Sequence, residues 1–150
     1  MQKLNINWQR LVTENETCPR CSKTGNEFRK AVAVLDRSFR NLGIKVEPET
    51  KKISLQEFKD NPLESNKIMI NGKELEKWIN GEVGQSECCD VCGPTDCRTI
   101  EIDGEVYEEI PAELIIKAGL FAAGEMIGIK KTSSCCESTS VKPTQSGCCG

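Results

Sequence analysis

Hydrophobic and polar residues alternate at the start of the chain. Leu4, Ile6 and Trp8 are separated by single polar residues, and a period of two is typical of a strand with one buried face. Further along, hydrophobic residues recur at steps of three and four, which predicts a long amphipathic helix. These positions are Phe28, Ala31, Val32, Leu35, Phe39 and Leu42. Gly43 follows them and predicts the end of the helix, because glycine readily adopts the left-handed conformation found there.

The next segments alternate between predicted strands and short helices. Residues 44–46 (Ile-Lys-Val) indicate a second strand, and the long helix that joins it to the first favours parallel pairing in a βαβ unit. Residues 54–57 (Ser-Leu-Gln-Glu) are a capping-box sequence that predicts the start of a short helix, and Pro62 predicts its end. Residues 67–70 (Lys-Ile-Met-Ile) predict a third strand, which the turn pair Asn71-Gly72 closes.

The second half of the chain is less regular. Residues 73–81 form a short amphipathic segment, whereas residues 82–98 have no hydrophobic period and hold four cysteines. Residues 99–107 predict a hairpin that turns at Asp103-Gly104. Pro111 predicts the start of a last helix with a single hydrophobic face. The residues of that face are Leu114, Ile115, Ala118, Phe121 and Ala122.

The last segment differs in composition from the rest. From position 130 the chain consists mainly of Ser, Thr, Lys, Pro, Gly and Cys, and Val141 is its one apolar residue besides cysteine. Such a segment cannot bury a core, which predicts disorder. We therefore expect an α/β domain over residues 1–129, with a cysteine-rich insert at 82–98, and a flexible tail with Cys-Cys pairs over residues 130–150.

The composition narrows the possible chemistry. The chain has 150 residues, ten cysteines, no histidine and a net charge of −3. The absence of histidine excludes Ser-His and Cys-His catalytic pairs and any Cys/His zinc finger, so a soft-metal site must consist of thiolates, with or without carboxylates. The sequence predicts no signal peptide, no membrane insertion and no nucleic-acid binding. We expect a cytoplasmic protein whose cysteines serve metal binding or redox chemistry rather than a disulfide scaffold.

The motif Cys18-Pro19-Arg20-Cys21 lies between the first strand and the long helix. The start of a helix carries a partial positive charge and unpaired N–H groups, which stabilise a thiolate and lower its pKa. Arg20 adds a cation. We expect Cys18 to be the more exposed thiol and the nucleophile, and Cys21 to be the resolving thiol or a second ligand. The alternatives are a buried inert pair and one half of a zinc site.

This placement of the CPRC motif resembles the thioredoxin superfamily, in its shorter glutaredoxin-like arrangement. The resemblance covers about residues 3 to 125 and includes residues 68–73 (Ile-Met-Ile-Asn-Gly-Lys), which look like the family's strand and turn after the active-site loop. More narrowly, the chain resembles a bacterial and archaeal thioredoxin-like family of undefined function with a cysteine-bearing insert. The resemblance implies a mixed sheet with flanking helices.

The chain departs from the superfamily just before the third strand. Family members usually place a cis-proline there, facing the CxxC motif, where it shields the thiols and helps to bind substrates. Residues 64–67 of this chain are Glu-Ser-Asn-Lys, and Pro62 lies too far upstream to match. This departure argues against ordinary disulfide exchange and favours thiols that are open to a metal.

A second group of four cysteines lies in the insert. Cys88, Cys89, Cys92 and Cys97 fall within ten residues, which suffices for a tetrahedral zinc site. Their spacing matches neither a zinc ribbon nor the common ferredoxins. Metal or metalloid binding, a redox or regulatory disulfide, and inert thiols remain open, as does whether this group and the CxxC motif form one site.

The tail holds a third group, the adjacent pairs Cys135-Cys136 and Cys148-Cys149. Adjacent cysteines do not readily form a relaxed disulfide with each other, but they can chelate a large soft ion such as trivalent arsenic, antimony or mercury. The two pairs resemble the tails of bacterial arsenic metallochaperones, which also use a thioredoxin-like fold. The alternative is a nonspecific cysteine-rich tail.

The sequence thus favours a thiol-based protein that binds or sequesters soft metal or metalloid ions of the arsenic, mercury and zinc class. One alternative is a thiol–disulfide oxidoreductase, in which Cys18 and Cys21 are catalytic. The other is a zinc-stabilised interaction module. The expected ligand is zinc or a trivalent metalloid held by thiolates, without an organic cofactor. The expected partner is this ion or a protein thiol or disulfide.

Overall fold

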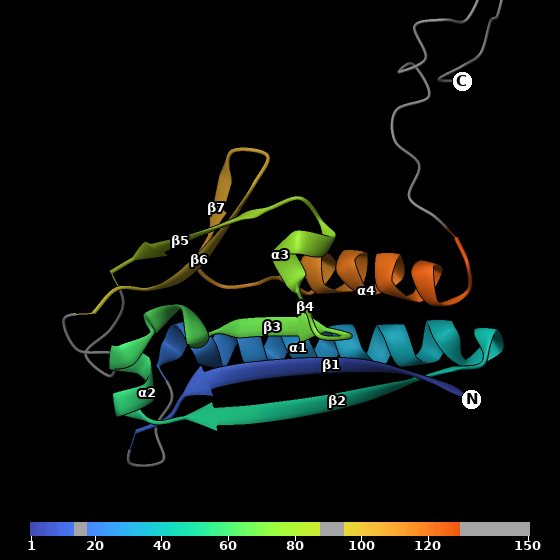
Figure 1. Ribbon diagram of the computed structural model, residues 1–150, viewed down its shortest axis with the longest axis horizontal. Coiled ribbons are helices and arrows are strands. Elements are labelled where there is room, and N and C mark those ends of the chain that lie inside the picture. Colours follow the sequence, from blue (N-terminus) through green and yellow to red (C-terminus); the bar gives the residue numbers. More distant parts are fainter. Residues whose placement is uncertain (14–17, 88–94, 130–150) are drawn as a thin grey trace, which may run out of the picture.

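Four strands form a mixed sheet at the base of the molecule (Figure 1). The computed structural model describes residues 1–13, 18–87 and 95–129. The strands are β1 (Gln2–Leu11), β2 (Ile44–Ile53), β3 (Lys67–Ile70) and β4 (Lys73–Glu74), in the spatial order β2-β1-β3-β4. The prediction of an α/β fold, with a mixed sheet and flanking helices, is therefore confirmed.

The register of this sheet follows from its connections. β1 and β2 are parallel from Gln2 beside Ile44 to Leu11 beside Ile53, as expected for two strands that a helix joins. β3 is antiparallel to β1 on its other side. Within the register, Trp8 of β1 lies opposite Ile68 of β3. The predicted βαβ unit and third strand are both confirmed.

The connecting helix α1 (Pro19–Phe39) begins one residue after Cys18 and covers the sheet. Its last turn tightens into the 3-10 helix η1 (Arg40–Leu42), and Gly43 at φ 70° ends it. Only glycine adopts this left-handed conformation without steric cost. The predicted helix and its stop are confirmed.

A short helix, α2 (Leu55–Asp60), follows β2. The predicted capping box is present: the Ser54 hydroxyl accepts from the N–H of Glu57 at 3.1 Å, and the Glu57 carboxylate accepts from the N–H of Ser54 at 2.6 Å. Pro62 begins a 3-10 turn, η2 (Pro62–Glu64), that leads the chain into β3. The capping box therefore fixes where this connection starts.

A second sheet packs above the first, next to the helix α3 (Leu75–Trp78). It contains β5 (Glu82–Ser86), β6 (Cys97–Ile102) and β7 (Glu105–Tyr107), all antiparallel. The β6–β7 hairpin turns at Asp103-Gly104 as predicted. β5 was not predicted, because its sequence Glu-Val-Gly-Gln-Ser has one large apolar residue and thus no alternation.

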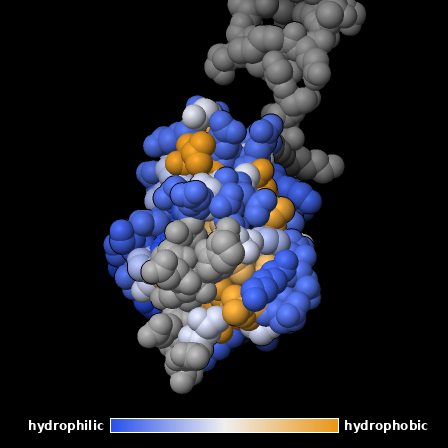
Figure 2. Space-filling model, turned by 90° about the vertical axis from the view of Figure 1, so that its left-hand side faces the viewer, coloured by the Kyte–Doolittle hydropathy of each residue, from blue (hydrophilic) through white to orange (hydrophobic). Residues whose placement is uncertain are grey.

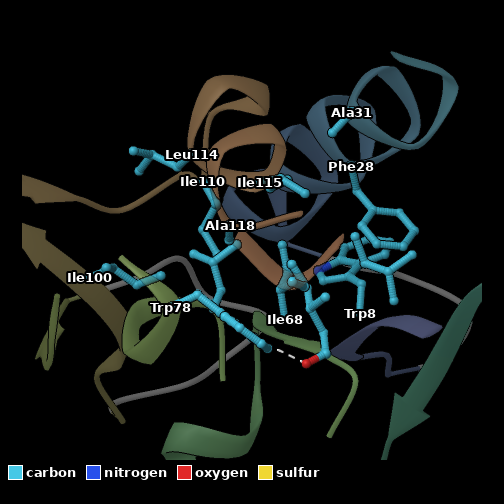
Figure 3. Packing of buried hydrophobic residues seen from close by; sticks show 14 of the residues in the cluster. Trp8, Phe28, Ala31, Ile68, Trp78, Ile100, Ile110, Leu114, Ile115 and Ala118 are labelled. Atoms are coloured by element: carbon cyan, nitrogen blue, oxygen red, sulfur yellow. Dashed lines mark hydrogen bonds between the residues drawn. The ribbon is translucent and has the colours of Figure 1, made fainter. Parts of the chain in front are cut away.

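The last helix, α4 (Ala112–Met126), packs against α1. Figure 3 shows side chains from both helices above Trp8 and Ile68 of the sheet. Burial of each large apolar side chain in this core contributes about 1.5–3 kcal/mol. Trp78 joins the core from α3, and its indole N–H donates to the Ile70 carbonyl at 3.0 Å.

None of the helices in the described part of the chain has the length and apolar character needed to cross a membrane.

Candidate functional site: a buried thiol pair at the start of a helix

Cys18 is the N-cap of α1, the residue that precedes the first helical turn. Its extended backbone, at φ −64° and ψ 155°, lets its sulfur accept the N–H of Cys21 at 3.5 Å. Pro19 occupies the first helical position, where its missing N–H costs nothing. The site therefore has the geometry that the motif predicts, in which helix N–H groups and the helix dipole favour a negative charge on Cys18.

The two thiols are more buried than the sequence suggests. Cys18 and Cys21 are each 1 % exposed, so the prediction that Cys18 is the more exposed thiol is wrong. The reason is that both cysteines belong to the hydrophobic core. Between them, Arg20 donates to the Glu87 carbonyl at 2.6 Å and pairs with Glu108 at 3.4 Å. These contacts join the start of α1 to the residues at the ends of β5 and β7.

The face at which α1 begins is shown in Figure 2. Hydrophobic side chains are exposed there in limited areas between hydrophilic ones. The guanidinium group of Arg20, which the sequence predicts as a nearby cation, donates to the Glu87 carbonyl and pairs with Glu108.

Cys21 and Cys18 differ in their electrostatic environment. The pKa of Cys21 is raised far above its ordinary value, first by its hydrogen bond to Cys18, then by burial and by the charge on Cys18. All three effects favour the protonated form of Cys21.

Ser65 completes the surroundings of Cys21. Its hydroxyl lies 3.7 Å from the Cys21 sulfur and accepts the N–H of Leu11 at 3.2 Å. The hydrogen bond from Ser65 lowers the pKa of Cys21, against the stronger effects that raise it. Sequence reasoning noted this stretch only for its missing proline. The start of β3 beside the CxxC motif was the signal that could have identified Ser65.

The structure brings a third thiol to the pair. Cys97 begins β6, is 1 % exposed, and lies near enough for its charge to raise the pKa of Cys21 further. The sequence left open whether the insert and the CxxC motif form one site. Cys97, one of the four insert cysteines, thus interacts electrostatically with Cys21 although it follows it by 76 residues in the chain.

The residue after Cys97 explains how it is held there. Arg98 donates to the Leu63 carbonyl at 2.7 Å and to the Glu76 carboxylate. Arg98 and Glu76 are 3 % and 2 % exposed, respectively. Burial raises the pKa of Glu76, and the charge of Arg98 opposes this. The buried ion pair therefore attaches the start of β6 to α3, and the hydrogen bond to Leu63 attaches it to η2.

The remaining predicted ligands lie outside the described residues. They are Cys88, Cys89, Cys92, Cys135, Cys136, Cys148 and Cys149. Within the described residues, no group of three or more cysteine, aspartate or glutamate side chains is arranged to hold a metal ion. Among the described cysteines, Cys18 and Cys21 are linked by the hydrogen bond from the Cys21 N–H to the Cys18 sulfur.

Comparison with known proteins places this site within a family. A family model described as a domain of unknown function, DUF2703, matches residues 4–119. The chain belongs to the DUF2703 family. The DUF2703 region contains Cys18, Cys21 and Cys97 and ends before the tail. A similar protein from Archaeoglobus fulgidus, described as uncharacterized, is 42% identical over 113 residues, which are 75% of this chain and 82% of that protein. No solved structure matches the chain.

Proposed function

We propose that the protein binds soft metal or metalloid ions, such as divalent mercury or trivalent arsenic, through the sulfurs of Cys18 and Cys21. The observation that carries this proposal is the buried, hydrogen-bonded thiol pair at the start of α1. Thiolates prefer soft ions over the harder cations that carboxylates bind. Cys18 supplies the ready thiolate, and Cys21 supplies the second sulfur when it loses its proton.

The binding step is balanced without any oxidant. Arsenous acid would exchange two hydroxyl groups for two sulfurs. Because Cys18 reacts as a thiolate, one hydroxyl group would leave as hydroxide, and the other would leave as water with the proton of Cys21. Divalent mercury would bind both sulfurs and release that one proton. In both reactions Cys21 must lose its proton, and its raised pKa makes it the more costly ligand to deprotonate.

The burial of the pair favours a small ion over a protein substrate. A disulfide of another protein must approach the Cys18 sulfur in line, but this sulfur belongs to a side chain that is 1 % exposed. A single ion or arsenous acid needs far less displacement of the surrounding residues. The same burial shields a bound ion from competing thiols in solution.

The topology supports a thioredoxin-like assignment of the fold, which is part of the proposal. The sheet has the order β2-β1-β3-β4, and with β1 and β2 parallel and β3 antiparallel to β1 it is a mixed sheet, as the resemblance implies. The CxxC motif lies at the start of the crossover helix, as in that superfamily. The second sheet, β5-β6-β7, is then an addition between the last strand and the last helix.

Native mass spectrometry of protein purified without oxygen tests the proposal. Mercury, arsenite and zinc are offered in turn, in the presence of excess glutathione, to the protein and to two double variants. The unchanged protein should retain one ion despite the glutathione, and the double variant with serine at Cys18 and Cys21 should not retain it. The matched control replaces Cys135 and Cys136 with serine and should keep that ion. Equal retention in all three proteins would refute the proposal, and retention of zinc alone would favour the zinc-stabilised module.

One observation favours a second candidate, a thiol–disulfide oxidoreductase. The unequal protonation of the pair suits a mechanism in which the Cys18 thiolate attacks a disulfide and expels one thiolate. Cys21 would then lose its proton, attack the Cys18 sulfur and release the second thiol, leaving a Cys18–Cys21 disulfide. A generic disulfide substrate with a regenerating reductant tests this. Multiple turnovers that disappear in the Cys18→Ser protein would favour the oxidoreductase over the ion-binding protein.

A further inference from the structure

A pocket of about 500 Å³ lies between α3 and α4, and we call it the lysine pocket. Its lining residues come from β4, α3, the part of α4 from Lys117 onward and the residues that follow α4, and the ribbon shows α3 and this part of α4 away from the start of α1 (Figure 1). Its volume is within the range of small-molecule sites. The thiol chemistry described above makes no use of it, so its role is independent of the proposed function.

The charge of the lysine pocket is opposite to that of the chain. Lys73, Lys77 and Lys117 line it, and Glu125 is the one acidic residue among its walls. The chain as a whole carries a net charge of −3. Such a local excess of cations attracts an anionic group and raises its local concentration.

The other walls of the lysine pocket are apolar. Leu120, Phe121 and Ile129 contribute side chains that are 53%, 37% and 63% exposed. Trp78 adds a ring, and the Lys73 ammonium group lies 4.2 Å from the centre of that ring. A grouping of exposed apolar side chains that charged residues surround is typical of a binding site.

Gly124 keeps one wall of the lysine pocket open. Glycine within a helix is less favourable than alanine, so each glycine of α4 needs a reason. At Gly119 the reason is packing, because an added Cβ would lie 2.6 Å from the Leu35 side chain of α1. At Gly124 an added Cβ would meet only Ile129, at an ordinary 3.7 Å. Packing within the described chain therefore does not require Gly124, which lines the lysine pocket.

We propose that the lysine pocket binds a small anionic amphiphile, such as a medium-chain carboxylate. The apolar body would lie along Trp78, Leu120 and Phe121, and the anionic group would lie among the lysines. The chain's own tail fits less well, because Lys130 and Lys131 directly follow Ile129 and carry the same charge as the pocket.

Calorimetric titration of the full-length protein with decanoate, below its micelle concentration, tests this proposal. Decanol and decyltrimethylammonium have the same apolar chain with no charge and with the opposite charge. We expect decanoate to bind with one-to-one stoichiometry, at least tenfold more tightly than decanol, and decyltrimethylammonium not to bind. Equal binding of all three compounds would overturn the proposal.

Two variants and a matched control locate the site. Replacing Lys77 and Lys117 with glutamine should weaken decanoate binding at least tenfold, whereas the same change at Lys51 and Lys52 of β2 should have no effect. Gly124→Leu should fill the pocket and abolish binding, with an unchanged circular dichroism spectrum. Undiminished binding in either pocket variant would refute the assignment.

Two other occupants are distinguishable in the same proteins. If Gly124→Leu shifts the NMR signals of residues 130–150 without any ligand, the tail occupies the pocket and the proposal fails. If the full-length protein sediments with phospholipid vesicles through Lys77 and Lys117 but does not bind free decanoate, the surface contacts membranes and the proposal also fails.

Discussion

Cys18 and Cys21 carry the same thiol group in two different electrostatic environments. Cys18 caps a 21-residue helix, and its sulfur accepts a backbone N–H. Cys21 lies one turn further in, next to Ser65, where burial and the neighbouring sulfur raise its pKa. One charge shared unequally between two sulfurs is cheaper in this buried place than two charges. We therefore expect Cys21 to lose its proton only when a ligand binds to the sulfurs.

The first prediction concerns the acidity of Cys18. Its alkylation should follow a pH profile whose midpoint lies below that of Cys148, which the sequence does not place at a helix start. Residue-resolved mass spectrometry with a small alkylating reagent measures both profiles. The midpoint rather than the absolute rate is compared, because burial slows the reaction of Cys18 at every pH. Coincident midpoints would show that the helix start does not activate this thiol.

The second prediction concerns the stability of the protein in alkali. Cys21 stays protonated in the folded state, whereas in the unfolded chain its thiol ionises near its ordinary pKa of 9.0. The stabilising contribution is therefore complete below about pH 9 and is lost as the pH rises further. One such group decreases the free energy of unfolding by up to about 1.4 kcal/mol per pH unit.

Urea unfolding under reducing conditions, at several values between pH 8 and pH 10.5, measures this slope. The Cys21→Ala protein is the control, since it keeps all other titrating groups. Its free energy of unfolding should decrease less steeply above pH 9. Parallel slopes in the two proteins would contradict the assigned protonation of Cys21.

At the scale of single elements, the two glycines of α4 give a third prediction. Gly119→Ala should destabilise the protein by about 1–3 kcal/mol, because the new Cβ would overlap Leu35 of α1. Gly124→Ala should stabilise it by about 0.5–1 kcal/mol, because alanine favours the helix and its Cβ meets only Ile129 at 3.7 Å. Thermal unfolding of the two proteins compares them directly. The same sign for both changes would mean that α1–α4 packing does not explain Gly119.

The fourth prediction concerns the ion pair that holds β6 in place. Arg98→Met leaves the buried Glu76 carboxylate without its cation and should destabilise the fold by about 3–5 kcal/mol. Adding Glu76→Leu should recover part of this loss, because the uncompensated charge disappears. Urea unfolding of the single and double variants measures both effects.

The same variants report on the position of Cys97. If Arg98 holds the start of β6 at the thiol pair, Cys97 should become alkylated faster in the Arg98→Met protein than in the unchanged protein. Lys52→Met, on the exposed surface of β2, is the control and should change neither stability nor alkylation. An unchanged rate at Cys97 in a folded Arg98→Met protein would show that the ion pair does not position this thiol.

The elements that the sequence predicted correctly are those whose sequence signal lies within a few residues. The alternation around Ile6, the capping box at Ser54 and the turn at Asp103-Gly104 each lie within a few residues, and the structure has all three. β5 has no such signal, because pairing with β6 rather than its own sequence makes it a strand. Cys97 was predicted in the insert, but its approach to Cys21 depends on Arg98 and Glu76, which lie far apart in the sequence.

At the scale of the whole molecule, the site combines segments from the entire domain. α1 provides the thiol pair, the residue before β3 provides Ser65, and β6 provides Cys97. A local motif showed the first of these, whereas only the tertiary fold brings Ser65 and Cys97 to the pair. The lysine pocket, lined mainly by residues of α3 and α4, shares no residue with this site. The two sites can therefore be altered separately.

The fifth prediction separates the domain from the tail. Removing residues 131–150 should leave the free energy of unfolding of the metal-free protein unchanged within about 0.5 kcal/mol, because the removed segment has one apolar residue besides its cysteines. The number of bound mercury or arsenic ions should fall, since four of the ten cysteines are lost. A full-length protein with serine at Cys135, Cys136, Cys148 and Cys149 separates the loss of thiols from the loss of length, and it should show the same reduced capacity. Denaturant unfolding and native mass spectrometry measure the two quantities, and a large loss of stability on truncation would show that the tail contributes to the core.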